Sequence, residues 1–398
     1  MLILTALTGT LVLAAPGMSM SVLFTEISGD LHLSVAQVGW IWGIGSLPGI
    51  VSSLLGGAIT DRFGPKRVMM AAAFLLGIAI ASRGLAGDFA SLMVTALFIG
   101  ALSPLISTCA IKICGLWFPQ RQWGLANGIF TLGMAFGFFG GSLISATVLS
   151  PLLGGWRPVM FMYGALCVAL MAPWFFSKAR PPRNEALPSS LPIGKSMAHI
   201  LKIKNIWLLG LAMLGLSGCM QSMTGYLPLY LQGQGWSGVN ADGALALLHA
   251  MSMTFVLPLT MLSDRLKGRK LLLAGMFILI IIGNALLAGA SGWTVWMAVA
   301  LGGMVRDASM ALLFAMAVEC EGVGPAYAGT ATGFIVLNTN LGALVGSPAG
   351  NQLASLSPGL PFTFWAGMAG VGFISLLLVK THRINRVQVD PGYAESEA

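Results

Sequence analysis

Charged residues are what this sequence most conspicuously has little of. Its 398 residues include 21 Lys or Arg and 13 Asp or Glu, so only 9% of the chain is charged. A soluble protein of this size normally carries about 25% charged residues, most of them at its surface. The composition therefore excludes an ordinary soluble fold and indicates that much of the surface faces lipid.

Cysteine and histidine are too few and too scattered to form a site. The chain has five cysteines and four histidines, and no Cys-x-x-Cys pair occurs. An odd number of cysteines lying mostly within apolar runs is typical of free thiols rather than of a disulfide framework. No cluster has the ligand spacing of a metal site. We therefore expect neither a metal nor a cofactor.

Apolar runs, in contrast, fill the sequence. Hydrophobic residues make up 56% of the chain, and the mean hydropathy is +0.85. Runs of about 20 residues recur along the whole length, long enough to cross a hydrocarbon core of about 30 Å as helix. A bilayer admits only helices and closed barrels, and these runs lack the alternation of barrel strands. The expected spans are 3–25, 34–60, 68–87, 90–117, 123–148, 157–177, 205–231, 241–262, 271–290, 293–318, 328–353 and 361–380.

These runs predict an all-α membrane protein with twelve transmembrane helices. The first run has no basic segment before it and is long for the apolar part of a signal peptide, so we assign it to the first helix. If both termini are cytoplasmic, every Lys and Arg lies on the cytoplasmic side except Arg83, Arg157 and Arg306. This positive-inside bias predicts a multi-pass protein of the cell (inner) membrane. The net charge of +8 thus reports topology in the lipid bilayer and not nucleic-acid binding.

A polar segment divides the chain into two parts. Residues 178–204 contain four prolines and several basic residues, and they predict a cytoplasmic linker. The domains expected are a six-helix bundle over 1–177, this linker, and a second six-helix bundle with a short cytoplasmic tail over 205–398.

The two parts repeat each other. The charged motif at Asp61 recurs at Asp264, and at the same offset of 203 residues Ser19-Met20-Ser21 matches Ser222-Met223-Thr224. At an offset of 205, "GLANG" from Gly124 matches "GTATG" from Gly329. Matches in register across separate helices indicate a duplicated six-helix unit, hence two pseudo-symmetric bundles. Many secondary transporters are built this way, with the substrate site between the halves.

The charged turn after the second run resembles the signature loop of the major facilitator superfamily. That loop reads Gly-x-x-x-Asp-(Arg/Lys)-x-Gly followed by basic residues, and the resemblance extends over the whole chain. It implies a transporter rather than an enzyme, in which the loop acts as a latch between conformations. The residues that match it here are Gly57, Asp61, Arg62, Gly64, Lys66 and Arg67, and in the second copy Asp264, Arg265, Arg269 and Lys270.

A second segment, "WFPQRQWGLANG" from Trp117 to Gly128, narrows the resemblance. It is similar to the Trp-Phe-Pro…Ala-Asn-Gly segment of porters for small anions such as nitrate, nitrite, cyanate and organic carboxylates. Drug/proton antiporters of the superfamily usually carry Gly-Pro-x-x-Gly in the fifth helix, where this chain has "GFFGGS". The resemblance therefore favours anions over drugs.

The pair Arg306 and Asp307 is unusual because it lies near the predicted midplane of the tenth span. A charge at that depth costs at least about 2.5 kcal/mol and marks a functional site or a buried pair. Adjacent helical residues point about 100° apart, so we expect the two side chains to face different ways. Arg306 is the candidate for substrate binding and Asp307 for proton coupling, with an interior salt bridge as the alternative.

His249 lies deep in the eighth span and is a candidate for substrate binding or for carrying a coupling proton. Packing is its alternative role. We expect Lys112 to snorkel to the membrane surface, and Glu26, Arg83 and Arg157 at outer helix ends to need no special role. The uncharged candidates for the substrate site are Gln221, Tyr226, Asn338 and Asn340, and only one of the two asparagines is expected to face the cavity.

The function expected is secondary active transport of a small solute by alternating access. A small anion, organic or inorganic, is favoured because a guanidinium binds a carboxylate or nitrate at two points. Proton symport is the expected coupling, and a monomer is the expected state. The alternatives are proton-driven export of drugs or metabolites and, in a different class, a membrane receptor that transports nothing.

The topology makes a first testable prediction. Single cysteines are placed in the 178–204 linker and in the Gly233–Gly238 loop and are exposed to an impermeant thiol reagent on intact cells. We expect the loop to be labelled and the linker to be protected, because nearly all basic residues lie on the linker's side. Labelling of the linker from outside would contradict this topology.

Overall fold

The computed structural model describes residues 1–177, 193–266 and 268–380, and these residues form helices joined by short connections. Twelve helical segments of the described chain are long and apolar enough to cross a membrane. The predicted runs agree with them closely, so the fold class is confirmed. The helices are α1 (Leu2–Leu7), η1 (Thr8–Ala14), α2 (Ala15–Asp30), α3 (Val35–Ile44), α4 (Ser46–Phe63), α5 (Pro65–Arg83), α6 (Phe89–Trp117), η2 (Gln120–Gln122), α7 (Trp123–Ile144), η3 (Ser145–Leu149), α8 (Ser150–Leu153), α9 (Trp156–Ala169), α10 (Met171–Phe176), α11 (Ile193–Ile200), α12 (Lys204–Gly233), α13 (Gly238–Arg265), α14 (Arg269–Leu287), α15 (Trp293–Val318), α16 (Gly324–Leu353) and α17 (Leu360–Leu378).

Local sequence sets where these helices begin and end. Ser34 and Asp88 each accept a hydrogen bond from the backbone three residues on, and both form capping boxes before α3 and α6. Gly64 ends α4 with φ +82°, a conformation that a side chain disfavours, and Pro65 starts α5 at once. The signature loop is therefore a tight turn between two spans.

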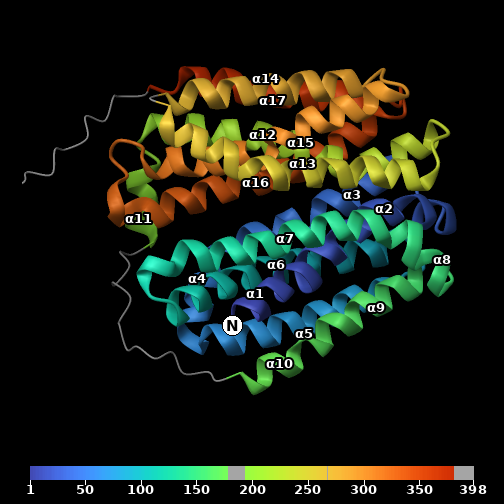
Figure 1. Cartoon of the computed structure of the whole chain (residues 1–398), viewed down its shortest axis with the longest axis horizontal. Coiled ribbons are helices and arrows are strands. Elements are labelled where there is room, and N and C mark those ends of the chain that lie inside the picture. The colour runs from blue at the N-terminus through green and yellow to red at the C-terminus, as the bar shows by residue number, and fades with distance from the viewer. Residues whose placement is uncertain (178–192, 267, 381–398) are drawn as a thin grey trace, which may run out of the picture.

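The helices form two bundles, with α1 to α10 in one and α12 to α17 in the other (Figure 1). The first span of each bundle crosses that of the other near the molecular centre, where the Ser21 hydroxyl donates to the Thr224 carbonyl at 2.5 Å. These two residues are equivalent in the sequence repeat, and equivalent residues meet at a two-fold axis. The repeat found in the sequence is therefore also a repeat in space.

Matching glycines pack the fifth span of each bundle against its first. A Cβ at Gly141 of α7 would lie 2.7 Å from the carbonyl oxygen of Ala15, and one at Gly346 of α16 would lie 2.6 Å from that of Gly218. Either would overlap the neighbouring backbone, so these positions permit close helix contact inside a bundle.

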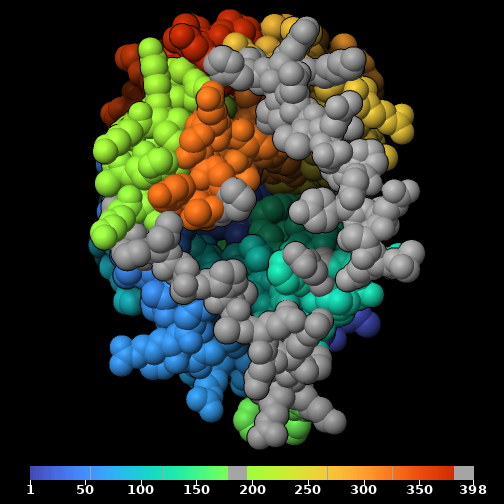
Figure 2. All heavy atoms as spheres, turned by 90° about the vertical axis from the view of Figure 1, so that its left-hand side faces the viewer, coloured from blue at the N-terminus to red at the C-terminus, as the bar shows by residue number. Residues whose placement is uncertain are grey.

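The two ends of the molecule differ. We call the end at α11 the linker end and the end at the α2–α3 connection the far end. At the far end the bundles touch, since the Trp42 indole donates to the Gln221 carbonyl at 2.7 Å and the Asn351 amide to the Val35 carbonyl at 3.1 Å. Figure 2 looks onto the linker end and shows a hollow between the orange start of α16 and the teal residues around the α6–α7 connection. This conformation is closed at the far end and open at the linker end.

Glycine at the far-end contact generates the second prediction. A methyl at Gly39 would place its carbon 2.7 Å from the Ser347 carbonyl oxygen and from Asn351 Cβ, across the bundle interface. Overpacking costs about 1–3 kcal/mol, so Gly39→Ala should shift the equilibrium toward a far-open state about five- to hundredfold.

The shift is measured as the labelling rate of a cysteine placed at Gln232, which lines a far-end cavity. Gly29→Ala is the matched control, because a Cβ there meets nothing within 4 Å. Equal labelling rates in the two variants would show that this contact does not hold the far end shut.

Candidate functional site

Arg306 and His249 meet between two helices of the second bundle. Both lie near the middle of their helices, α15 and α13, and both are buried, with 7% and 3% of their surface exposed. Arg306 Nη1 is 3.5 Å from His249 Nδ1. Phe138 of α7 stacks on the imidazole with ring centroids 5.5 Å apart. Because α7 belongs to the first bundle, the pair lies where the two bundles face each other.

This contact leaves two buried N–H groups without an acceptor. A guanidinium has only donors, so its contact with His249 uses the lone pair on Nδ1, and the proton of the neutral imidazole then sits on Nε2. Among the described residues, neither His249 Nε2 nor Arg306 Nε has a hydrogen-bond partner. Unpaired buried donors are rare in proteins and call for an explanation. The chemistry they offer is the binding of an acceptor, best of all an anion.

Asp307 also reaches Arg306. Its Oδ1 lies 3.5 Å from Arg306 Nη1, while 37% of its side chain is exposed. Its backbone N–H donates to the Ser252 hydroxyl of α13 at 3.3 Å. Helix geometry predicted that these adjacent side chains diverge, but the long Arg306 side chain turns back toward its neighbour. A partly hydrated carboxylate and a small anion would therefore share one guanidinium.

The two candidate asparagines face opposite ways. Asn340 lies against the first bundle, with Oδ1 3.1 Å from the position of a Cβ at Gly49 of α4. Asn338 lies against α12 of its own bundle, with Nδ2 2.8 Å from the position of a Cβ at Gly210. Only Asn340 therefore lies against the other bundle, and that only one of the two faces a substrate cavity stays a prediction.

The remaining uncharged candidates lie toward the far-end contact. The Gln221 carbonyl accepts from Trp42, which places this residue at the bundle interface. The Tyr226 hydroxyl donates to the Pro358 carbonyl at 3.1 Å, and its ring packs on Phe362 and Trp365. Tyr226 is thus occupied inside its own bundle, and the structure does not bring it to Arg306.

The signature loop of the first bundle is held by a residue whose role the sequence did not suggest. Lys112 of α6 forms a 2.7 Å ion pair with Asp61 and donates to the Gly57 carbonyl at 2.9 Å. Its ammonium thus reaches the exposed Asp61 near the end of α4, and it pairs there with this carboxylate as well as with the Gly57 carbonyl. Arg62 lies 5.4 Å from the centre of the Phe63 ring and takes no part in this ion pair.

The second copy of the loop uses its own residues in the same way. Arg269 bridges Asp264 at 2.7 Å and Glu319, at the end of α15, at 2.5 Å. Arg265 is exposed. In each bundle the loop carboxylate is therefore paired with a cation inside the same bundle, and sequence spacing alone did not reveal Lys112 or Glu319 as members.

One basic residue of each loop caps the last span of its bundle. Lys66 donates to the carbonyls of Phe175, at 3.2 Å, and of Ser177. Lys270 donates to the carbonyls of Leu377 and Val379 at 2.7 and 2.8 Å. A cation at a helix C-terminus pairs with its unsatisfied carbonyls and its dipole. The sequence repeat aligned Lys66 with Arg269, but the second loop has one more residue before its glycine, so Lys270 is the structural equivalent.

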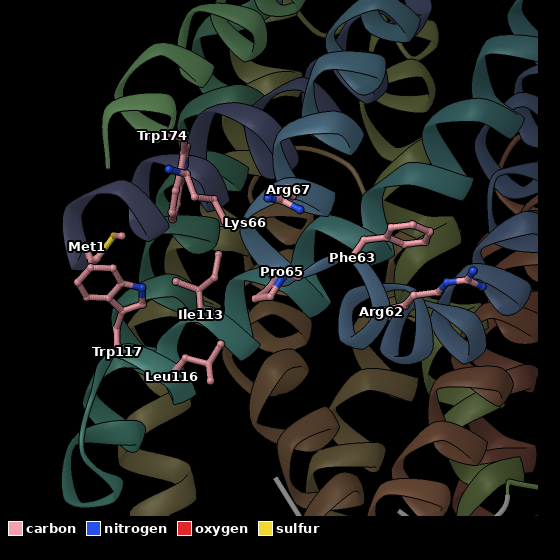
Figure 3. Close-up of a pocket in the computed structure, with 11 residues that line it drawn as sticks. Met1, Arg62, Phe63, Pro65, Lys66, Arg67, Ile113, Leu116, Trp117 and Trp174 are labelled. Atoms are coloured by element: carbon pink, nitrogen blue, oxygen red, sulfur yellow. The ribbon is translucent and has the colours of Figure 1, made fainter. Parts of the chain in front are cut away.

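A cavity of about 450 Å³ lies beside this loop (Figure 3). Basic side chains enter from the start of α5, and Trp117 and Trp174 come from the ends of α6 and α10. It lies at a helix end, whereas Arg306 lies in mid-helix, so this cavity is separate from the central site. Its lining consists of Met1, Arg62, Phe63, Gly64, Pro65, Lys66, Arg67, Ile113, Leu116, Trp117 and Trp174.

Two bundles of six spans with an opening at one end, and a buried cation where they meet, define a membrane transport protein. The sequence model of the Major Facilitator Superfamily matches residues 5–346. The chain belongs to this superfamily, whose members are transporters rather than enzymes.

Named relatives agree with this assignment. The chain is 27% identical to the probable nitrate/nitrite antiporter NarK1 of Thermus thermophilus over 71% of this chain and 65% of the relative. It is 26% identical to the probable nitrate/nitrite transporter NarK2 of Mycobacterium tuberculosis over 68% and 66%. It thus spans about two thirds of the length of these relatives. The crystal structure of a D-xylose-proton symporter has the same fold, with a TM-score of 0.78 at 14% identity over 96% of this chain and 98% of that one.

The loop geometry generates the third prediction. Asp61→Asn and Lys112→Gln should each slow substrate counterflow in vesicles about two- to fivefold, because each removes the same partly exposed ion pair, worth up to about 1 kcal/mol. The temperature of unfolding and the affinity for the substrate should change little, because the loop lies at the end of the helices. Arg62→Gln is the matched control, since Arg62 stands outside the pair. A normal rate in Asp61→Asn would remove the latch role.

Proposed function

We propose that this protein is a secondary active transporter for a small anion, coupled to proton symport and working by alternating access. We further propose that it resides as a monomer in the cell membrane, with the linker and both termini in the cytoplasm. The bundles over 1–177 and 205–398 then rock as units about the central crossing, and the hollow at the linker end is the cytoplasmic opening.

The observation that carries the proposal is the pair of buried, unaccepted N–H groups on Arg306 and His249. A guanidinium near the midplane is costly, so it needs a counter-ion, an aqueous cavity or a ligand. Asp307 meets Arg306 only at 3.5 Å, and an anion bound at Arg306 would supply the acceptor that Nε lacks. The relatives named for nitrate and nitrite support an anion as the ligand.

Asp307 supplies a reason for proton coupling. Its carboxylate and a substrate anion compete for Arg306, since both are negative and Asp307 already lies 3.5 Å away. Protonation of Asp307 removes the competitor and frees the guanidinium. Proton and anion binding therefore favour each other, and by linkage each raises the affinity for the other. Uptake of the two together would also balance their charges.

One experiment separates proton symport from anion exchange, and both of these from drug export or a receptor. The relative named as a nitrate/nitrite antiporter favours exchange of anions as the second candidate. Vesicles loaded with nitrate or nitrite and diluted into labelled nitrate will show counterflow for any carrier. A pH gradient accelerates net uptake only if protons are coupled. Absence of counterflow with every small anion tested would support drug export or a receptor instead.

The fourth prediction concerns Arg306. Thermal-shift screening with nitrate, nitrite and small carboxylates selects the probe, and calorimetry then measures its affinity. Arg306→Ala should lower affinity about ten- to hundredfold, because a lost charge-assisted contact costs about 1.5–3 kcal/mol. Arg306→Lys should keep part of the binding and lose the two-point geometry.

Asp307→Asn is the matched variant, because it removes the competing charge and keeps the size. It should bind the probe at least as tightly as the parent protein, with a weaker dependence on pH. Folded Arg306→Ala with unchanged affinity would instead assign Arg306 to a structural ion pair.

A further inference from the structure

Asp242 is a buried carboxyl group that no part of the proposed mechanism uses. It lies in the second turn of α13, near the far end, and none of its surface is exposed. Neither Oδ1 nor Oδ2 has a hydrogen-bond partner among the described residues. An ionised carboxylate in such a place, without a partner, would cost many kcal/mol, so a buried carboxyl of this kind becomes neutral by taking up a proton.

A second carboxyl group faces Asp242 from the other bundle. A cavity of about 260 Å³ at the far end is lined by Thr25 and Glu26 of α2, by Gln232 of α12 and by Asp242 itself. The Ser150 hydroxyl donates to Glu26 Oε2 at 2.6 Å. Among the described residues no Lys, Arg or His lines this cavity, so no cation there could pair with an ionised Asp242.

The helices packed against α13 provide no counter-ion either. Neither α7 nor η3 contains a titratable residue. On α12 the Tyr230 hydroxyl donates to the Leu287 carbonyl, and the charges of α14 lie at its opposite end. The charges of α15, Arg306 and Asp307, lie beside His249, which is seven residues or about 10 Å deeper along α13 than Asp242.

We propose that Asp242 is a proton-binding site that controls opening of the far end. The carboxylic acid keeps its proton while the two bundles enclose it opposite Glu26. When the bundles part and water enters, the O–H bond breaks, the proton passes to water, and the charged Asp242 then faces Glu26. Repulsion between the two carboxylates, and the cost of burying a charge, oppose reclosure until a proton is bound again.

This site is distinct from the one in the proposed function, because it lies two helical turns outside His249 and does not contact the anion's donors. It couples the pH on the far side to the conformation, whether or not a substrate is bound. Because the closed state holds one proton more than the open state, the ratio of far-open to far-closed molecules should rise with pH, by up to about tenfold per pH unit.

The test measures conformation without substrate. Spin labels on cysteines at Gly29 and Gln234, which are exposed at the far end of opposite bundles, report the separation of the bundles by pulsed electron resonance across a range of pH. In the parent protein we expect the far-open fraction to grow as pH rises. In Asp242→Asn, a permanently neutral mimic, we expect the far end to stay closed at every pH.

Two further variants make the outcome decisive. Glu26→Gln removes the facing charge and should keep a pH dependence, since the titrating group remains. If Asp242→Asn does not fold, Asp242→Leu replaces it, and we expect its far end to stay closed at every pH as well. A pH dependence in either neutral variant equal to that of the parent would overturn the proposal. So would a shift produced by sodium at constant pH, which would make this a cation site. No anion is present in this experiment. A result that overturns the role of Asp242 therefore does not affect the proposed anion site at Arg306, which calorimetry tests separately.

Discussion

A charged side chain inside a lipid bilayer is stable only where a counter-ion, water or a ligand interacts with it. The rest of this structure depends on that constraint. At the linker end, described basic residues such as Lys66, Lys112, Arg269 and Lys270 pair with carboxylates or with the carbonyls of helix ends. The same constraint makes the exceptions informative. Arg306, His249 and Asp242 lie within spans, and each keeps at least one polar atom without a partner. These three are the ionisable residues among the buried groups that lack a partner in the described part of the chain.

The duplicated unit places these exceptions at the contact between halves. Close packing through small residues joins the fifth span to the first within each bundle, so each bundle is a firm body. Contacts between bundles are fewer and concentrate at one end, through Trp42, Gly39 and Asn351. The central donors and the peripheral carboxyl group therefore lie on surfaces that would separate and rejoin in the proposed rocking of the bundles. A titrating group there acts on the conformation, whereas one inside a bundle would act only on stability.

Much of this was predictable from the sequence, because the signals were local or periodic. Apolar runs gave the spans, and the repeat gave the two bundles. Arg306 and His249 were identified as candidates because each lies deep within a predicted span. The contact between them was not predicted. Partners on other helices could not be predicted, because they depend on packing. The ion pair of Lys112 with Asp61 is one example. Asp242 is another, since it lies within two turns of its helix start, where a carboxylate usually meets water. Asp242 is buried, and Glu26 lies opposite it, only because α2 and η3 lie over α13 in the folded chain.

The capping of α10 and α17 by Lys66 and Lys270 has a consequence for solute leaving through the linker end. Basic residues are numerous at that end, and in the proposed transport of an anion, ammonium groups with free donors would hold the departing anion. These two lysines donate hydrogen bonds to carbonyl oxygens, while Lys112 and Arg269 form ion pairs with carboxylates. The bonds to carbonyl oxygens leave the positive charge in place, but they occupy N–H groups that could otherwise bind a solute. This end of the molecule therefore stays positively charged while fewer of its donors are free to hold the proposed anion.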